Sequence, residues 1–537
     1  MRTLRWSVPL LLTLGLALAG TPAVAVQPVD TGVETTLAGV DLERATVLDL
    51  QRAMSSHRFS SVLLTAFYVR RIHALNPSLH AVIETNTDAL RQAAASDLQR
   101  RRHGARSALE GIPVLLKDNV DTADREHSTA GSFALVRSTP ARNAFLAQRL
   151  RAAGAVILGK ANLSEWANFR SLHSSSGWSG RGGQTNNPYV LDRNPCGSSS
   201  GSGAAAAANL ATVTIGTETD GSIVCPSGAN SAVGIKPSLG LVSRSGVVPI
   251  SAEQDTAGPI TRNVTDAAAV LSVIQGVDPR DPATGPAAPF VGRDYLRALD
   301  SGALRGARIG VWRAPAADNP EVAAQLEQTV NRVRALGATI VDNITLPGLD
   351  QVDANEFPAL LTEFKHDINA YLAARPGPHP ADLAGLIAFN IANKDIEMPF
   401  FQQEIFELAQ ATTGDLNDPT YRQQRATATS AARNAIDTAV ATNRLDAILA
   451  PTNNAAWVTD LNNGDDFTGF VGSSTPAAVA GYPNITVPAG YARGELPLGV
   501  SFFGGRWSEP TLIALAFAFE QATRVRKPPR FLPTLPA

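Results

Sequence analysis

Two glycine- and serine-rich turns, Cys196-Gly-Ser-Ser-Ser-Gly-Ser-Gly203 and Gly216-Thr-Glu-Thr-Asp-Gly-Ser222, decide how this chain folds. Between them, alanines over 204–210 predict a helix, and β-branched residues over 212–215 predict a strand. Upstream, Gly111-Ile-Pro-Val-Leu-Leu-Lys117 ends a short apolar run on a lysine. A basic amine, a relay hydroxyl and a nucleophilic hydroxyl suffice for acyl transfer without histidine. The pattern therefore predicts a serine hydrolase.

The tract 171–203 around the first turn is rich in Ser, Gly and Asn, a composition that is also typical of flexible linkers. A linker should separate two folded units, yet this tract runs directly into the predicted helix and strand. We therefore interpret it as a functional loop. Walls of a substrate pocket are expected from 171–190 and from 390–405, without an assignment of individual contacts.

Composition excludes several classes of function. The 537 residues are 44% hydrophobic and 18% charged, and the formal net charge is −2. Such a chain has no basic field that would favour nucleic acid or an anionic membrane as a partner. Its length is enough for a large core and would by itself suggest two or more domains.

The first 25 residues have the pattern of a secretory signal peptide. Arg2 and Arg5 precede an apolar run over 8–19, and Ala23-Val-Ala25 supplies small residues at a cleavage-type spacing. The run is shorter than the roughly 20 residues of a spanning helix, and no later segment is long and apolar enough to replace it. We expect a mature chain over 26–537 without a membrane span, exported to the periplasm or the medium.

Alternating strand and helix patterns predict a sheet covered by helices on both faces. Prolines interrupt the chain over 276–306, which is the best candidate for a surface excursion. The expected helices lie at 47–56, 60–74 (ending at Asn76-Pro77), 87–102, 143–152, 320–336, most of 354–442, and 509–524. The expected strands lie at 80–85, 112–116, 155–159, 212–215, 308–312, 338–341, 446–449, 484–487 and 498–503.

The only two cysteines, Cys196 and Cys225, each lie close to a serine of interest. Two cysteines do not make a disulfide framework, so we favour two small buried thiols, with a bridge as the alternative. No Cys-x-x-Cys and no His-x-x-x-His pair is present, and we expect neither a metal nor an organic cofactor.

Other serine and phosphate chemistries fit the sequence less well. Gly197-Ser-Ser-Ser-Gly201 also matches the nucleophile elbow of α/β-hydrolases, with Ser199 as the nucleophile of an esterase. An elbow needs a strand directly before it, but Asp192-Arg-Asn-Pro-Cys196 is polar and broken by proline. The downstream histidines, His366 and His379, lie in regions that are expected to be helix or loop. A phosphate-binding loop would need the Walker or Gly-x-Gly-x-x-Gly spacing, and both are absent.

Four ordered motifs carry a resemblance to a known family: Gly111–Asn119, Cys196-Gly-Ser-Ser-Ser-Gly-Ser-Gly-Ala-Ala205, Gly216-Thr-Glu-Thr-Asp-Gly-Ser-Ile223 and Gly234-Ile-Lys-Pro-Ser238. Together they resemble the amidase signature family over about Val47 to Thr523, and within it the bacterial peptide amidases. The resemblance implies a single large α/β/α domain around a mixed, mostly parallel sheet. It also implies that Ser222 is the nucleophile, Ser198 a serine entered through a cis peptide bond, and Lys117 the base.

The resemblance implies hydrolysis of linear amides, such as peptide C-terminal amides, to ammonia and a carboxylic acid. A small amide or peptide amide would be the only partner of a monomeric enzyme. The family also includes the glutamine-hydrolysing subunit of tRNA-dependent amidotransferases, but a signal peptide argues against that cytosolic role. An exported binding protein without activity is a further alternative, disfavoured because Lys117, Ser198 and Ser222 are all present.

The residues themselves specify what the mechanism needs. Lys117 must be neutral to accept a proton, and burial at the end of its apolar run would lower its pKa toward neutrality. The turn Thr219-Asp-Gly-Ser222 can aim backbone N–H groups of Thr219, Asp220, Gly221 and Ser222 at an oxyanion. The family usually has Gly-Gly-Ser here, whereas this chain has Asp220-Gly-Ser. We expect Asp220 to accept a hydrogen bond from a substrate carboxamide, with bracing of its own turn as the alternative.

Overall fold

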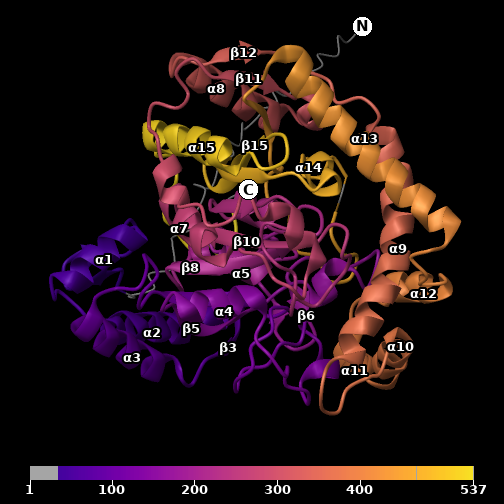
Figure 1. Ribbon diagram of the computed structural model, residues 1–537, viewed down its shortest axis with the longest axis horizontal. Helices are drawn as coiled ribbons and strands as arrows, with labels where there is room; N and C mark the ends of the chain where they lie inside the picture. The colour runs from indigo at the N-terminus through magenta and orange to yellow at the C-terminus, as the bar shows by residue number, and fades with distance from the viewer. Residues whose placement is uncertain (1–33, 467, 536–537) are drawn as a thin grey trace, which may run out of the picture.

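A computed structural model describes residues 34–466 and 468–535. The predicted signal peptide lies outside the described residues. One eleven-stranded sheet runs through the protein, with helices around it (Figure 1). Its strands, from one edge to the other, are β12 (Thr339–Val341), β11 (Arg308–Val311), β13 (Ala447–Pro451), β15 (Leu496–Phe503), β14 (Asn484–Ala492), β9 (Val233–Lys236), β10 (Thr256–Thr261), β8 (Val213–Glu218), β4 (Pro113–Lys117), β5 (Val156–Ala161) and β3 (Val82–Thr85).

The sheet is mixed, as expected, but parallel pairs do not predominate. Parallel pairing joins β12 to β11, β11 to β13, β8 to β4 and β4 to β5. The other neighbours are antiparallel, among them the long β14–β15 hairpin and the pairs of β10 with β8 and β9. Antiparallel neighbours need only a short connection, such as the turn at Arg493 between β14 and β15, whereas parallel ones need a crossover. The expectation of a mostly parallel sheet was therefore wrong in this respect.

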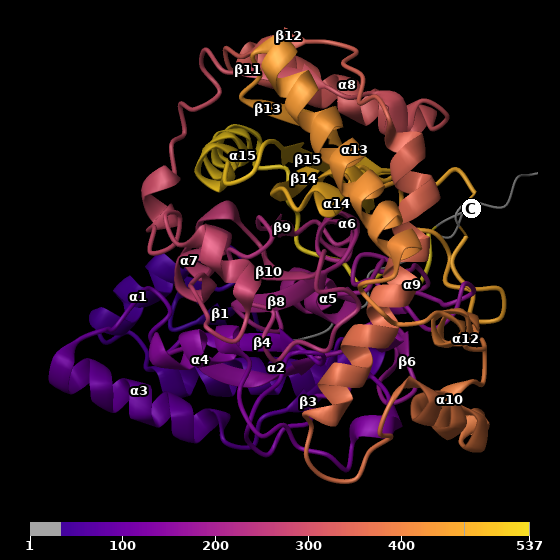
Figure 2. The ribbon, with the colours of Figure 1, turned by 45° about the vertical axis from the view of Figure 1, so that its right-hand side comes forward.

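Helices cover the sheet and extend beyond it. The pair α9–α13 runs along one side of the molecule, and the two helices lie against each other in both views (Figures 1 and 2). The helices are α1 (Val47–Ser55), α2 (Ser61–Leu79), α3 (Ala89–His103), α4 (Phe145–Ala152), α5 (Ser200–Ala207), α6 (Val224–Ala229), α7 (Val264–Ile274), α8 (Pro320–Ala335), α9 (Leu349–Ala373), α10 (Leu383–Ala392), α11 (Lys394–Glu397), α12 (Glu404–Ala411), α13 (Pro419–Asn443), α14 (Thr475–Ala480) and α15 (Glu509–Thr523). Two short ribbons lie apart from the large sheet: β1 (Thr36–Leu37) with β2 (Val40–Asp41), and β6 (Trp178–Ser179) with β7 (Gly183–Gln184).

The helix α2 does not end at Asn76-Pro77 as expected, but continues to Leu79. His80 then adopts a left-handed conformation and donates its N–H to the carbonyl of Asn76. The Asn76 side chain also bonds the N–H and the carbonyl of Val82, each at 2.8 Å. The asparagine therefore ties the helix end to the start of β3, a tertiary contact that outweighs the local effect of proline.

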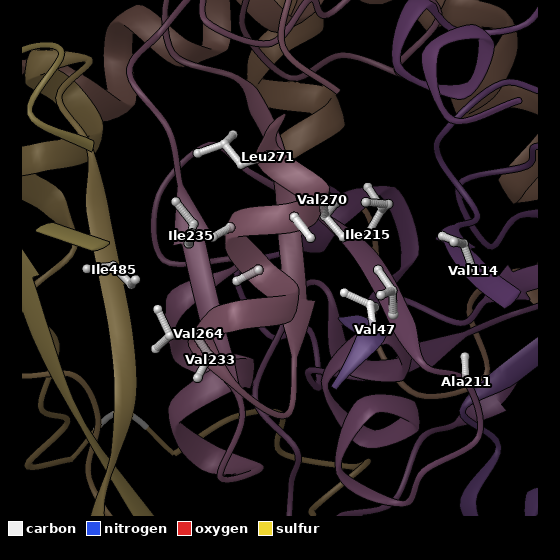
Figure 3. Packing of buried hydrophobic residues seen from close by; sticks show 14 of the residues in the cluster. Val47, Val114, Ala211, Ile215, Val233, Ile235, Val264, Val270, Leu271 and Ile485 are labelled. Atoms are coloured by element: carbon white, nitrogen blue, oxygen red, sulfur yellow. The ribbon is translucent and has the colours of Figure 1, made fainter. Parts of the chain in front are cut away.

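Aliphatic side chains on the central strands form the core with α7. Val114 of β4, Ile215 of β8 and Ile235 of β9 belong with Val270 of the helix to one cluster of buried residues (Figure 3). All eleven residues of α7 except Ser272 and Val273 are buried. A strand such as β4, buried over its whole length, carries the residue at its end into the interior, and in this chain that residue is Lys117.

Small residues let α5 approach the sheet closely. A Cβ on Gly201 would lie 2.4 Å from the carbonyl oxygen of Ala81 and 2.6 Å from the amide nitrogen of Asn162, both on the backbone. No side chain fits at such a distance. The Gly/Ser tract thus begins the helix at Ser200, four residues before the alanine run at which we expected it to begin. The tract is a packed loop and helix rather than a linker.

Candidate active site

Lys117 lies at the end of β4, and its side chain is fully buried. Its Nζ is 2.8 Å from the Ser198 Oγ, 2.9 Å from the Thr217 Oγ1 and 3.2 Å from the Thr217 carbonyl oxygen. Burial lowers the pKa of the Lys117 amine to about 7, and the negative charges of Asp255 and Glu218 only partly oppose that effect. The structure therefore joins two of the predicted residues, Lys117 and Ser198, by a direct hydrogen bond.

Ser198 follows a cis peptide bond, Gly197–Ser198, as the resemblance implied. The serine is fully buried, and its carbonyl accepts the N–H of Ser164. Ser222 comes from the end of the second turn and is 8% exposed. Ser222 also lines a cavity of about 460 Å³. Among Lys117, Ser198 and Ser222, it is thus Ser222 that borders the space where a ligand could bind.

Ser199, the rival nucleophile, is held by the backbone. Its Oγ donates to the Thr217 carbonyl at 3.0 Å and accepts the Thr217 N–H at 3.2 Å. It is fully buried and immediately precedes α5, without a strand directly before it. His366 contacts Asp367, and His379 contacts backbone carbonyls of its own segment. The partners that an elbow serine would need are therefore engaged elsewhere.

The turn before Ser222 is held from both sides. Thr219 donates its hydroxyl to Asp255 at 2.5 Å, and Gln254 donates to the Thr219 carbonyl at 3.0 Å. On the other side, the Glu218 carboxylate accepts the N–H groups of residues 223 and 224 at the start of α6. Gly221 has φ +78°, a left-handed conformation that favours glycine. These contacts fix the backbone on which the predicted oxyanion donors lie.

Asp220 borders the same cavity. Its Oδ2 accepts the Thr475 hydroxyl at 2.6 Å, whereas its buried Oδ1 has no hydrogen-bond partner among the described residues. Burial raises the pKa of the Asp220 carboxyl, against the lowering effect of hydrogen bonds from Ser474 and Thr475. A buried oxygen without a partner costs free energy unless a ligand or water satisfies it.

The cavity has apolar and aromatic walls from distant segments. Ala167 and Asn168 come from a turn in which Trp166, Ala167 and Asn168 all have positive φ. Phe169, Ser176, Ile250, Leu360 of α9, Trp457 and Phe470 also line the cavity. Of the two segments expected to form walls, 171–190 contributes Ser176, and no residue of 390–405 lines this cavity.

Cys196 and Cys225 form a disulfide, with their Cα atoms 6.0 Å apart. The interpretation as two free buried thiols was wrong. The 29-residue separation spans α5 and β8, and this chain path returns Cys225 to the first turn, which the sequence alone did not indicate. Both cysteines border the cavity. The bridge therefore links the segment before Ser198 to the segment after Ser222.

Several residues of the site were not predicted from the sequence. Thr217 contacts Lys117, and Asp255 and Gln254 hold the turn at Thr219. Thr217 could have been found, because it belongs to the motif Gly216-Thr-Glu-Thr-Asp-Gly-Ser222 at the end of β8, next to the strand that carries Lys117. Asp255 and Gln254 follow a loop without regular pattern, and no local signal points to them.

Comparisons with known proteins agree with this geometry. The profile of the family described as Amidase matches residues 63–513. A probable amidase of Arabidopsis thaliana is 44% identical over 499 residues, which cover 91% of this chain and 92% of that protein. The chain belongs to the amidase family.

Solved structures extend the agreement to the fold of this amidase. The native peptide amidase from Stenotrophomonas maltophilia superposes with a TM-score of 0.87 at 48% identity, and the match covers 91% of this chain and 99% of that one. The peptide amidase PAM in complex with the competitive inhibitor chymostatin gives a TM-score of 0.88 at 49% identity, with the same coverage. The amidase signature fold is therefore confirmed.

Two absences hold for the described part of this amidase. Within 34–466 and 468–535, no helix combines the length and apolar character needed to cross a bilayer. Across the same residues, no three His, Cys, Asp or Glu side chains gather in a way that could hold a metal ion.

Proposed function

We propose that this amidase hydrolyses primary amides, in particular peptide C-terminal amides, to ammonia and a carboxylic acid. Ser222 would form the acyl-enzyme, Ser198 would relay protons, and Lys117 would be the base. The observation that carries the proposal is the buried Lys117 amine, with its pKa near 7, within hydrogen-bond distance of Ser198. At the ordinary lysine pKa of ~10.4, only about 1 in 2,500 amines would be neutral at pH 7.

The contacts of Lys117 suit a neutral amine. A neutral amine has two N–H groups and one lone pair. The two N–H groups can donate to the Thr217 hydroxyl and carbonyl oxygens, at 2.9 and 3.2 Å, which leaves the lone pair to accept the Ser198 proton at 2.8 Å. As Ser222 attacks the substrate carbonyl, its proton passes to Ser198 while the Ser198 proton passes to Lys117. On collapse, the same path returns a proton to the leaving amine, and ammonia departs.

The resulting tetrahedral oxyanion needs donors that are already oriented. The backbone N–H groups of Thr219, Asp220, Gly221 and Ser222 are our candidates, because the contacts of Thr219 and Glu218 hold this turn at both ends. The loss of one such donor typically costs 100- to 1,000-fold in rate. Water then attacks the acyl-enzyme and gives a proton to Ser198 and Lys117. The same groups return a proton to the Ser222 oxygen as the carboxylic acid leaves.

Asp220 supports the preference for primary amides. Its Oδ1 is buried at the cavity without a partner among the described residues, and a carboxamide NH2 beside Ser222 would satisfy it. An ester has no such donor. We therefore expect Asp220→Asn to reduce turnover of a peptide amide far more than turnover of the matched methyl ester. Equal losses on both substrates would reject this role and favour bracing of the turn.

The cavity supports a peptide as the acyl group. Because ammonia is a small leaving group, the apolar walls formed by Phe169, Leu360, Trp457 and Phe470 would contact the acyl part of the substrate. About 460 Å³ lies within the range of pockets that enclose small organic ligands. The solved neighbours described as peptide amidase support the same assignment.

Export of the enzyme is part of the proposal. The pattern over 1–25 predicts a signal peptide, and a disulfide beside the site is typical of oxidising compartments. Lys117, Ser198 and Ser222 all come from one chain, so the proposed site requires no second copy and we propose a monomer. N-terminal sequencing of the secreted protein and its hydrodynamic size would test these two points.

Ammonia release from a peptide amide tests the central claim. Ser222→Ala should abolish it, and Ser199→Ala is the matched control because its hydroxyl is engaged with the Thr217 backbone. We expect Ser199→Ala to retain most activity. Full activity of Ser222→Ala together with loss in Ser199→Ala would replace the proposal by the elbow mechanism.

A further inference from the structure

A long loop closes one wall of the cavity. We define the wall loop as residues 454–466 and 468–472, between Asn453 and Ser473. Trp457, Phe470 and Gly472 of this loop line the cavity. Its backbone bonds the segment before Cys196, because the Asn194 N–H donates to the Trp457 carbonyl at 2.8 Å. A second backbone bond joins the Thr459 N–H to the Asp192 carbonyl at 3.0 Å.

One carboxylate joins the wall loop to the rest of the cavity. Both oxygens of Asp465 lie 3.0 Å from the Ser176 amide nitrogen. Its Oδ1 also accepts from the Asn194 Nδ2 at 3.1 Å and from the Trp457 indole Nε1 at 3.2 Å. The Asp465 N–H donates to the Ser174 carbonyl at 3.2 Å. Trp457 and Ser176 line the cavity, whereas Asp465 does not, so the carboxylate can act on a ligand only through them.

The contact continues from Ser176 into the opposite wall. The Ser176 Oγ accepts from the Asn168 Nδ2 at 3.0 Å, and Asn168 also lines the cavity. Asn168 belongs to a turn of three residues with positive φ, a conformation that residues other than glycine rarely adopt. Surrounding contacts must hold such a turn in place. Asp465 therefore connects the aromatic wall at Trp457 with the polar wall at Ser176 and Asn168.

We propose that Asp465 is a positioning residue that holds these two walls around the acyl part of the substrate. The proposal rests on the function proposed above, since the acyl part is then the group that fills the cavity. The Asp465 carboxylate holds Trp457 and Ser176 in place before the substrate binds, so the free energy of binding does not include the cost of ordering these side chains. When the carboxylate is lost, large acyl groups bind less tightly, and small ones, which do not reach the walls, are unaffected.

Asp465 has a second possible role, and the experiment must distinguish it from the positioning of the walls. Asn194 bonds Asp465 through its Nδ2, and its Oδ1 accepts the Cys196 N–H at 2.8 Å, two residues before Ser198. Asp465 could thus support the segment from Asn194 to Ser198 instead of the walls. In that case its loss would slow the chemistry of Ser222 on every substrate. A reagent that reacts with Ser222 without touching the walls distinguishes the two roles.

The test compares Asp465→Asn with the wild type by the rate at which two phosphonates label Ser222. One reagent is a small diethyl fluorophosphonate, and the other carries an acetylated dipeptide. We expect the dipeptidyl reagent to label Asp465→Asn at least tenfold more slowly, with the small reagent within twofold of the wild type. On an acetylated dipeptide amide, KM should rise by a similar factor with kcat within about twofold. Asparagine keeps the size of aspartate, but its NH2 group is a donor and cannot accept the hydrogen bonds that Ser176, Asn194 and Trp457 donate to the carboxylate.

Matched variants complete the design. Asp466→Asn removes the same charge from the neighbouring position, where the side chain accepts the N–H of Thr468 in its own loop, and should change neither rate. Trp457→Phe keeps an aromatic ring and deletes one hydrogen bond to Asp465. We expect it to slow labelling by the dipeptidyl reagent alone, and by a smaller factor than Asp465→Asn. This variant tests the proposal even if Asp465→Asn does not fold. Equal slowing with both reagents, or no slowing in either variant, would overturn the proposal. Labelling requires no primary amide, so a wild type that labels but releases no ammonia contradicts only the proposed substrate.

Discussion

The pH dependence of kcat/KM provides the sharpest test of Lys117 as the base. Burial lowers the pKa of this amine to about 7, and only the neutral form can accept the Ser198 proton. The neutral fraction is then about one in eleven at pH 6 and about ten in eleven at pH 8. We expect kcat/KM on a peptide amide to rise about tenfold between these values along a single limb centred near pH 7, and then to level off.

The structure also predicts how the midpoint of that limb moves. The negative charge of Asp255 raises the pKa of Lys117, against the larger lowering effect of burial. Asp255→Asn removes this charge, so the midpoint should move below pH 7, even if the weaker hold on Thr219 lowers the plateau. Lys117→Arg should have no activity at any of these pH values, because a guanidinium stays protonated up to about pH 12.

The assay is ammonia release at fixed ionic strength in overlapping buffers from about pH 5 to about pH 9.5, a range that spans both the lowered and much of the ordinary lysine titration. An ordinary lysine would give a rate that still rises about tenfold per unit between pH 8 and 9. That result, or a midpoint that Asp255→Asn leaves unchanged or raises, would refute the assignment of the limb to Lys117.

Three further predictions concern stability and the turn. Because the pKa of Lys117 is lower in the folded chain (about 7) than its ordinary value of 10.5, the unfolded chain binds an extra proton between these pH values, and the stability of the wild type rises across that window. Lys117→Met should therefore raise the free energy of unfolding at pH 7 by at most about 5 kcal/mol, seen as a higher Tm, with a smaller gain at about pH 9.5; a lower Tm at pH 7 would contradict a costly buried amine. Cys196→Ser with Cys225→Ser opens a loop of 29 residues and should cost about 3–4 kcal/mol, seen as a Tm lower by a few degrees that reductant no longer shifts, whereas an unchanged Tm would mean that the bridge adds nothing. Gly221→Ala adds a Cβ at φ +78°, 3.2 Å from the Ser474 hydroxyl, and should reduce kcat about tenfold or more, while the control Gly505→Ala, at a glycine with nothing within 4 Å, leaves kcat unchanged; equal activity of the two variants would show that the turn tolerates strain.

The sequence predicted the parts of this fold whose signals are local. The apolar run before Lys117 predicted β4 to within a residue, and the helix and strand between the two turns were found because they alternate in composition. The elements that were missed lack such signals. The strand β10 contains Gly258 and Pro259, which usually mark turns, yet Gly258 is required because a Cβ there would lie 1.9 Å from the Ile235 carbonyl oxygen. The helix α7 is buried on almost every side and has no polar face to give it a helical period.

The same distinction separates the residues that we propose as catalytic from the cavity walls around them. Lys117, Ser198 and Ser222 each lie within a short motif. Sheet pairing of β4 with β8 brings the first and last of these motifs together, and the Ser199 N–H, which donates to the Ser222 carbonyl at 3.2 Å, joins the middle one to them. The walls come from 167–176, α9 and the wall loop, segments whose meeting depends on side chains such as Asp465 and Asn168 rather than on any motif. The pairing of Cys196 with Cys225 belongs to this second kind, since it follows from the return of α6 to the first turn.

The acyl preference that we propose could change without loss of the chemistry, because different contacts hold the cavity walls and the turn before Ser222. The turn before Ser222 is held by Asp255, Gln254 and Glu218. Their contacts go to Thr219 and to the start of α6 rather than to the wall loop. Substitutions at Trp457 or Phe470 can therefore alter the space for the acyl group while Lys117 keeps its buried contacts with Ser198 and Thr217.

Asn194 connects the cavity walls to the segment before Ser198, so a change in the walls that moves Asn194 would also alter the rate of the chemical step. Its side chain accepts the Cys196 N–H through Oδ1 and donates to Asp465 through Nδ2, so one planar amide joins the segment before Ser198 to the wall loop. Only a displacement of Asp465 large enough to move this amide would reach the backbone at Cys196, two residues before Ser198. Variants of the walls that leave the Asn194 amide in place should therefore change KM, and variants that displace it should change kcat as well.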